Sequence, residues 1–191
     1  MKKAFVNGVE ISAEAVAFEL ERLARFYVSH GFSQEEVKRA SGELRDKALE
    51  QAIGAKLLLD RAEQLDIEVS QKDVDEEVRK VVGQIGGEEN YRRALESQRI
   101  GEEAFRAELA KGAKVNKLVE QACANAPEPC EDEIVAFYES RRSAYAAEGK
   151  TLVDAHDAIR DLLRHQARGR AMDKFVEELR AAAKIEYTED R

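Results

Sequence analysis

Proline is almost absent from this chain, and its scarcity is what most constrains the fold. The 191 residues include two prolines, Pro127 and Pro129, which lie in one short segment. Because proline interrupts helices more strongly than any other residue, the rest of the chain lacks the usual helix breaker. Long stretches rich in Ala, Glu, Leu, Arg and Lys fill that space. We therefore predict a mainly α, multi-helix protein.

The spacing of apolar residues places the helices. Residues 44–65 have the strongest pattern, with two adjoining apolar rows, which predicts a central core helix. Ser70 and Asp73 resemble a capping box, which favours a helix start at that point. Further helices are predicted over residues 13–30, 33–39, 70–85, 88–96, 102–125, 131–145 and 152–183.

The two ends of the chain carry the strand signals. Asn7-Gly8 between apolar pairs predicts a hairpin, because both central positions of a type I′ turn need positive φ. Residues 184–187 alternate like a strand and need a partner. We expect Ile185 and Tyr187 to pair with residues 4–11 in a small β-sheet. The chain would then be a single domain over residues 1–191, with a helical part, 1–146, completed by residues 151–191.

Charge and hydropathy exclude several classes of protein. The net charge is −8, and basic and acidic residues are mixed throughout, so no basic face for nucleic acid is expected. No apolar run approaches the roughly 20 residues of a membrane span. The opening MKKAFVNGVEIS has two lysines but no apolar stretch of a signal peptide. We expect a cytoplasmic protein, or a periplasmic (cell-envelope) one if a leader has been removed.

The chain shows no pattern of an enzyme or metal site. His156 and His165 are nine positions apart, about 900° around a helix, so they face opposite sides. His30 stands alone. We interpret Cys123 and Cys130 as two free thiols, and a disulfide between them is the alternative. We expect no catalytic residue, no metal and no cofactor.

The charged runs are interpreted as solvated faces. The acidic run 73–77 lies beside Lys and Arg. Acidic residues at positions 157, 161 and 173 are interleaved with a basic run, which favours local ion pairs over a phosphate site. The basic run consists of Arg160, Arg164, His165, Arg168 and Arg170.

Five segments of the chain form an ordered set, and they are VNGVEIS, LRDKALEQAIGAKLLLDRAEQLDIEVSQKDVDEEV, RIGEEAFRAELAKGAKVNKLV, EDEIVAFYESRRSAY and TLVDAHDAIRDLLRHQARGRAMDKFVEELRAAAKIEY. In this order they resemble the SurA, PpiD and PrsA chaperones, whose peptide-binding domain is related to the C-terminal domain of trigger factor. Two departures stand out. Gly101 replaces the family's capping Ser, and residues 146–150 leave no room for the parvulin prolyl isomerase domain that relatives often carry.

The resemblance implies a holdase, a chaperone that binds unfolded or extended polypeptides without ATP and, here, without isomerase activity. Aromatic side chains that remain exposed would hold the client, and the candidates are Tyr91, Phe105, Tyr138 and Tyr145. The alternative is a dedicated assembly or structural partner of one client. That alternative includes a homodimer formed by strand or helix exchange.

Overall fold

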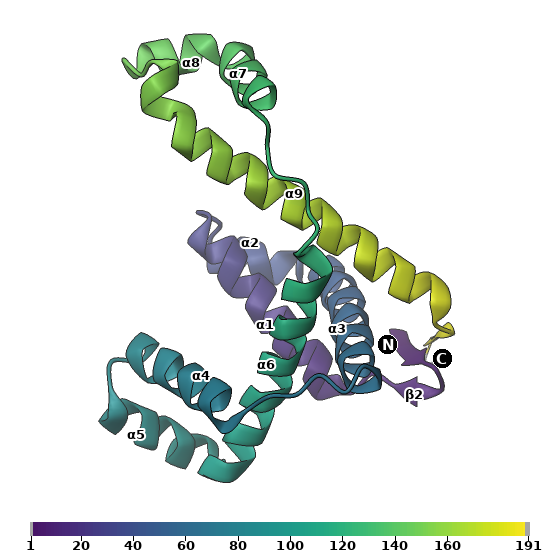
Figure 1. Cartoon of the computed structure of the whole chain (residues 1–191). Helices are drawn as coiled ribbons and strands as arrows, with labels where there is room; N and C mark the ends of the chain where they lie inside the picture. Colours follow the sequence, from purple (N-terminus) through teal and green to yellow (C-terminus); the bar gives the residue numbers. More distant parts are fainter. Residues whose placement is uncertain (1, 190–191) are drawn as a thin grey trace. The chain divides into compact units, whose positions relative to one another are not determined.

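The computed structural model describes residues 2–189 and divides into two units (Figure 1). Unit 1 runs to Leu118 and resumes at Val176, and unit 2 comprises Val119–Phe175. In the described residues the elements are β1 Lys2–Val6, β2 Val9–Glu10, α1 Ala13–Ser29, α2 Gln34–Arg39, α3 Ser41–Gln64, α4 Gln71–Gln84, α5 Glu88–Gln98, α6 Glu102–Cys123, α7 Glu131–Ser140, α8 Arg142–Ala147, α9 Leu152–Ala182 and β3 Ile185–Glu189. The prediction of a mainly α fold with a small sheet is confirmed. Single-domain behaviour over residues 1–191 stays a prediction.

The three strands form one antiparallel sheet in the order β2-β1-β3. Asn7 and Gly8 have φ of 52° and 84°, as a type I′ turn requires. β3 lies against β1 with Val6 opposite Ile185 and Ala4 opposite Tyr187, which confirms the predicted pairing. The Asn7 N–H also donates to the Lys184 carbonyl at 2.8 Å. The sheet therefore joins the beginning and the end of unit 1.

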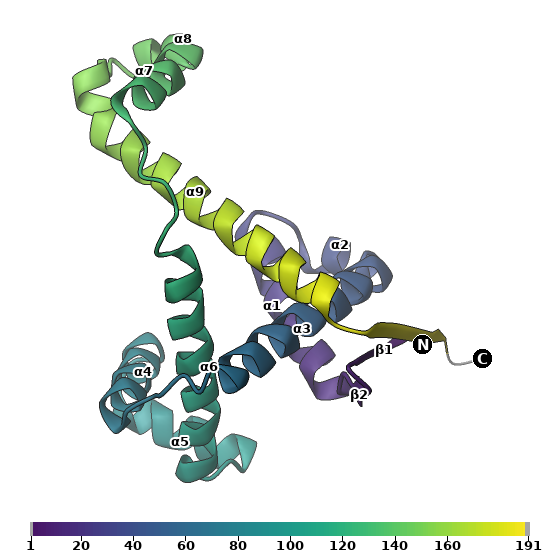
Figure 2. The same ribbon diagram turned by 45° about the vertical axis from the view of Figure 1, so that its right-hand side comes forward.

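The core of unit 1 lies where α3 meets α1 and the inner face of the sheet. Ala48, Ala52 and Ile53 of α3 are almost fully buried beside Val6. The alanines are small enough to let neighbouring backbones approach closely. Both views show α1 beside α3 (Figures 1 and 2). The end of α9 and the residues that follow it join this core through Leu179, Ala183 and Ile185, the last of which belongs to β3.

Local sequence signals set several helix ends. The Ser33 and Ser70 hydroxyls accept from the Glu36 and Asp73 N–H groups, and each carboxylate accepts from the serine N–H in return. These reciprocal bonds confirm the predicted start near Ser70. At the other end of α4, Gly86 and Gly87 have φ of 86° and 110°, where a side chain would be strained. The chain reverses there, and α5 runs back beside α4 (Figures 1 and 2).

Unit 2 has a small core and a helix break that the sequence pattern does not predict. Ile134 of α7 packs with Ala155 and Ile159 of α9. The single helix predicted over residues 131–145 is wrong, because Arg141, with φ −126° and ψ 19°, separates α7 from α8. Seven residues along a continuous helix advance by about 10.5 Å. The break instead brings the rings of Tyr138 and Tyr145 to a stacked separation of 5.1 Å.

The two cysteines belong to unit 2 and are both free. Cys123 is buried, and its Sγ lies 3.6 Å from the Arg168 carbonyl oxygen. Cys130 is exposed and immediately precedes α7. The thiol interpretation of the sequence therefore holds in this structure.

Candidate functional site

Large apolar side chains are exposed along α1 and the turn after it. Phe18 is 63% exposed, and Phe26, Val28 and Phe32 are also in contact with solvent. Single exposed apolar residues are common in soluble proteins, but a concentration on one helix and its turn marks a candidate interaction surface.

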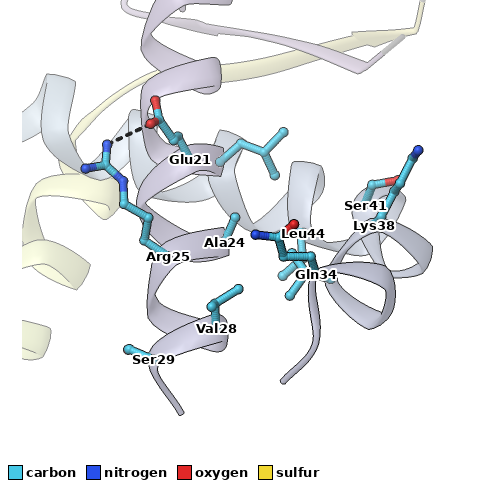
Figure 3. A pocket seen from close by; sticks show the side chains of 11 residues that line it. Glu21, Ala24, Arg25, Val28, Ser29, Gln34, Lys38, Ser41 and Leu44 are labelled. Atoms are coloured by element: carbon cyan, nitrogen blue, oxygen red, sulfur yellow. Dashed lines mark ion pairs between the residues drawn. The ribbon is translucent and has the colours of Figure 1, made fainter. Parts of the chain in front are cut away.

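An open groove of 580 Å³ runs along one side of the same helix (Figure 3). It lies between α1, α2 and the first turn of α3. Its apolar lining is entirely aliphatic and consists of Leu20, Ala24, Val28, Val37 and Leu44. A volume in this range is typical of pockets that bind small ligands or a few side chains of a peptide.

The groove follows from the local sequence of α1. Leu20, Ala24 and Val28 recur every four residues, so they form one row beside the face that packs on α3. Ala24 in the middle of that row has too small a side chain to fill the space between α1 and α2. The row therefore forms the wall of a hollow, while Leu20 also packs against the core.

The turn between α1 and α2 holds the opposite wall in place. Gly31 has a φ of 94° and ends α1. Phe32 then packs edge-on against Tyr27, with ring centroids 5.3 Å apart, and its N–H donates to the Tyr27 carbonyl. The Ser33–Glu36 capping box starts α2 immediately afterwards. These contacts position α2 so that Val37 and Lys38 border the groove.

Charged side chains stand on opposite sides of the apolar lining. On α1 the Glu21 carboxylate and the Arg25 guanidinium form an ion pair at 2.9 Å. On α2, Lys38 borders the groove, and none of the described residues forms an ion pair with it. Figure 3 shows Arg25 and Lys38 flanking the apolar residues.

The four aromatic residues proposed from the sequence lie in two separate pairs. In unit 1, Tyr91 and Phe105 meet edge-on at 5.7 Å. Tyr91 is only 4% exposed, its hydroxyl has no hydrogen-bond partner among the described atoms, and burial raises its pKa. In unit 2, Tyr138 stacks on Tyr145, and its hydroxyl donates to the Lys150 carbonyl at 3.1 Å. A role for either pair in client binding stays a prediction.

The sequence pattern predicts the helix over residues 13–30 but not the groove beside it. The signal that could have found it is the row of Leu20, Ala24 and Val28. A small residue that lies between two larger apolar ones at four-residue spacing indicates a helix face with a depression at the small residue.

A second hollow in unit 1 is polar. Its volume is 1150 Å³, and α6 contributes Lys111, Lys114 and Lys117 to its lining. The Lys117 ammonium donates to an Asp73 carboxylate oxygen at 2.6 Å and to the Glu68 carbonyl at 3.0 Å. These bonds attach α6 to the start of α4, so this side of the hollow has a structural role.

Ion pairs occupy part of the basic run that the sequence analysis singled out. Arg160 pairs with Asp157 and Glu131, and Arg164 pairs with Asp161 and Glu128. The prediction of local pairing is confirmed for these two arginines. Among the described residues, no group of three or more His, Cys, Asp or Glu side chains is placed to hold a metal ion. Within residues 2–189, no helix has the length and apolar character needed to cross a bilayer.

Comparison with known proteins connects this architecture to one family. A solved structure described with PEB4 and Cj1289, "two structurally related SurA-like chaperones" of Campylobacter jejuni, superposes with a TM-score of 0.62. The match covers 98% of this chain and 99% of that chain at 15% sequence identity, so it shows a shared fold. No curated protein matches the sequence. The family model for the SurA-like N-terminal domain matches residues 2–119, more than half of the chain. The chain therefore belongs to the SurA-like N-terminal domain family, and its described residues form a SurA-like chaperone domain in which no parvulin domain is inserted between α8 and α9.

Proposed function

We propose that this protein is an ATP-independent holdase that binds unfolded or extended polypeptide segments through the aliphatic groove of α1, α2 and α3. The observation that carries the proposal is the solvent-open apolar lining, which includes a 42%-exposed Val28. A client side chain that enters the groove removes apolar surface from water without requiring any reaction of the protein. Phe18, Phe26 and Phe32 are further exposed apolar side chains on α1 and the turn after it.

The proposal includes the absence of prolyl isomerase activity. Only residues 148–151 lie between α8 and α9, where the parvulin domain of relatives would be inserted. We expect the protein to leave the isomerisation rate of a prolyl test peptide at its uncatalysed value. Acceleration that scales with protein concentration would contradict this part of the proposal.

Light scattering of a chemically denatured client, diluted into buffer with and without the protein, tests the holdase. We expect suppression near equimolar ratio without ATP. Val28→Ser should raise the concentration needed for half suppression by about fivefold, because it removes roughly 1 kcal/mol of apolar contact.

Val153→Ser is the matched control. Val153 lies at the start of α9, is 85% exposed and is not part of the groove. It should leave suppression unchanged. An equal effect of both variants would reject the groove as the binding surface. No suppression of several unrelated clients would reject the general holdase and favour a partner dedicated to one client.

Cj1289, one of the two SurA-like chaperones described with the matched structure, is a periplasmic protein. On that likeness we place the action of this chain in the cell envelope, where unfolded chains in transit need a binder that does not depend on ATP. Fractionation of the cells that make the protein tests the compartment, and recovery with cytoplasmic markers alone would contradict it.

A further inference from the structure

We propose that the groove of α1, α2 and α3 selects apolar segments that carry an acidic side chain next to the apolar residues. The inference rests on the proposed binding of clients in this groove and adds the chemistry that distinguishes one client segment from another. Its basis is the charge around the groove.

The lining of the groove has the opposite charge balance to the rest of the chain. It includes one carboxylate, Glu21, and two cations, Arg25 and Lys38, for a formal balance of +1. The whole chain has a net charge of −8. A cationic border in an acidic protein is therefore a local feature of this surface.

The two cations are not equivalent. Arg25 is already engaged by Glu21 at 2.9 Å on the same helix. Lys38 stands on the other wall, and no described carboxylate lies within ion-pair distance of it. An acidic side chain of a bound segment would supply the missing partner of Lys38. A basic side chain in the same position would meet the ammonium with like charge.

The distance of each charge from a bound segment determines whether Lys38 or the net negative charge of the whole chain has the larger effect on it. At physiological salt the Debye length is about 8 Å, so carboxylates farther away than this are largely screened from a segment in the groove. Lys38 borders the groove and would lie within that distance of a bound side chain. The nearby cation therefore has more influence than the distant net negative charge.

Both partners are exposed, so the preference is modest. Exposed ion pairs of this kind change affinity by about two- to fivefold. The apolar lining supplies most of the binding, and the charge provides the selectivity.

Fluorescence anisotropy with three matched labelled peptides tests the inference on the full chain. The peptides share one aliphatic core and differ only in one flanking residue, which is Asp, Asn or Lys. We expect the Asp peptide to bind about two- to fivefold more tightly than the Asn peptide, and the Lys peptide most weakly. The differences should shrink at about 1 M salt, where the Debye length is about 3 Å.

Charge reversal identifies the responsible group. Lys38→Glu should invert the order of the three peptides. Lys72→Glu on α4 makes the same change in net charge at an exposed lysine outside the groove and should preserve the order. Circular dichroism verifies that both variants are folded.

The outcomes separate this inference from the proposed function. If the peptides bind equally and Val28→Ser still weakens all three, the groove binds clients and the acidic preference is overturned. If Lys38→Glu and Lys72→Glu act alike, net charge rather than Lys38 sets the order, and the inference is also overturned. If no peptide binds while the protein still suppresses aggregation, holdase activity resides elsewhere and the inference fails with the groove.

Discussion

His156 of α9 connects two helices of unit 2 through its imidazole ring. Its Nε2 lies 2.8 Å from a carboxylate oxygen of Glu131 on α7, and its Nδ1 lies 3.3 Å from Asp157. The hydrogen bonds to Glu131 and then Asp157 raise the pKa of His156, while burial and the nearby Arg160 oppose the rise. The charged imidazole therefore stabilises the folded unit fully below the unfolded pKa of about 6.5, and this contribution is lost as pH rises through the folded pKa.

We expect the ring protons of His156 to titrate above pH 6.5 in an NMR pH series, and Glu131→Gln to lower that midpoint. The His156→Gln and His165→Gln variants assign the signals. The hydrogen bond between His156 and Glu131 also lowers the pKa of Glu131. The contribution of the ionised Glu131 to the stability of the folded state is therefore lost as pH falls through that lowered pKa. An unchanged His156 midpoint in Glu131→Gln would show that the ion pair does not form in solution.

At the scale of elements, the start of α4 depends on one carboxylate. Asp73 accepts from Lys117 of α6 and from both the N–H and the hydroxyl of Ser70. The Lys117 bond first, and then the Ser70 bonds, lower the pKa of Asp73 to about 2. Asp73→Asn should increase hydrogen exchange at the first amides of α4, because it removes the charge from all three bonds.

The contribution of Asp73 to folding stability should persist above pH 4 and be lost as pH falls toward 2. A carboxylate with a lowered pKa stabilises the folded state only while it is ionised. Glu103→Gln is a control with an exposed side chain in the first turn of α6. If Asp73→Asn left exchange at the start of α4 unchanged, the cap and its bond to Lys117 would not hold this helix end.

Features that depend on neighbouring residues could be predicted from the sequence. The Asn7-Gly8 turn and the Ser70–Asp73 cap were predictable because each is fixed by side chains within a few positions. The break at Arg141 was not, because it is a change of backbone conformation at one residue that the spacing of apolar side chains does not record. The groove was not predicted either, because it is space left by Ala24 between three helices rather than a contact that a pattern records.

At the scale of the whole molecule, β3 holds the two sequence segments of unit 1 together. The Asn7 N–H donates to the Lys184 carbonyl, and the Ile11 N–H donates to the Ala4 carbonyl. Because the backbone groups of successive residues in a strand point to opposite sides, odd-numbered residues of β1 hydrogen-bond to β3 and even-numbered ones hydrogen-bond to β2. A chain that ends at Ala183 should therefore lose hydrogen-exchange protection at Lys3 and Phe5. It should also unfold at lower denaturant, because Ile185 no longer covers the core.

The amide of Ile134 is an internal reference, since it belongs to unit 2 and bonds to the Cys130 carbonyl. We expect its protection to be unchanged in the shortened chain. Continued protection of Lys3 and Phe5 would show that β3 does not hold β1.

The pairing of β1 with β3 also fixes an order of events during protein synthesis. Asn7 and Lys184 are separated by 177 positions, so at about 5–20 residues per second β1 waits on the order of 10 s for its partner to be made. All of unit 2 is translated within that interval. The unit that begins first on the ribosome is therefore the last to be completed, and until then one edge of its first strand is open to pairing with another chain.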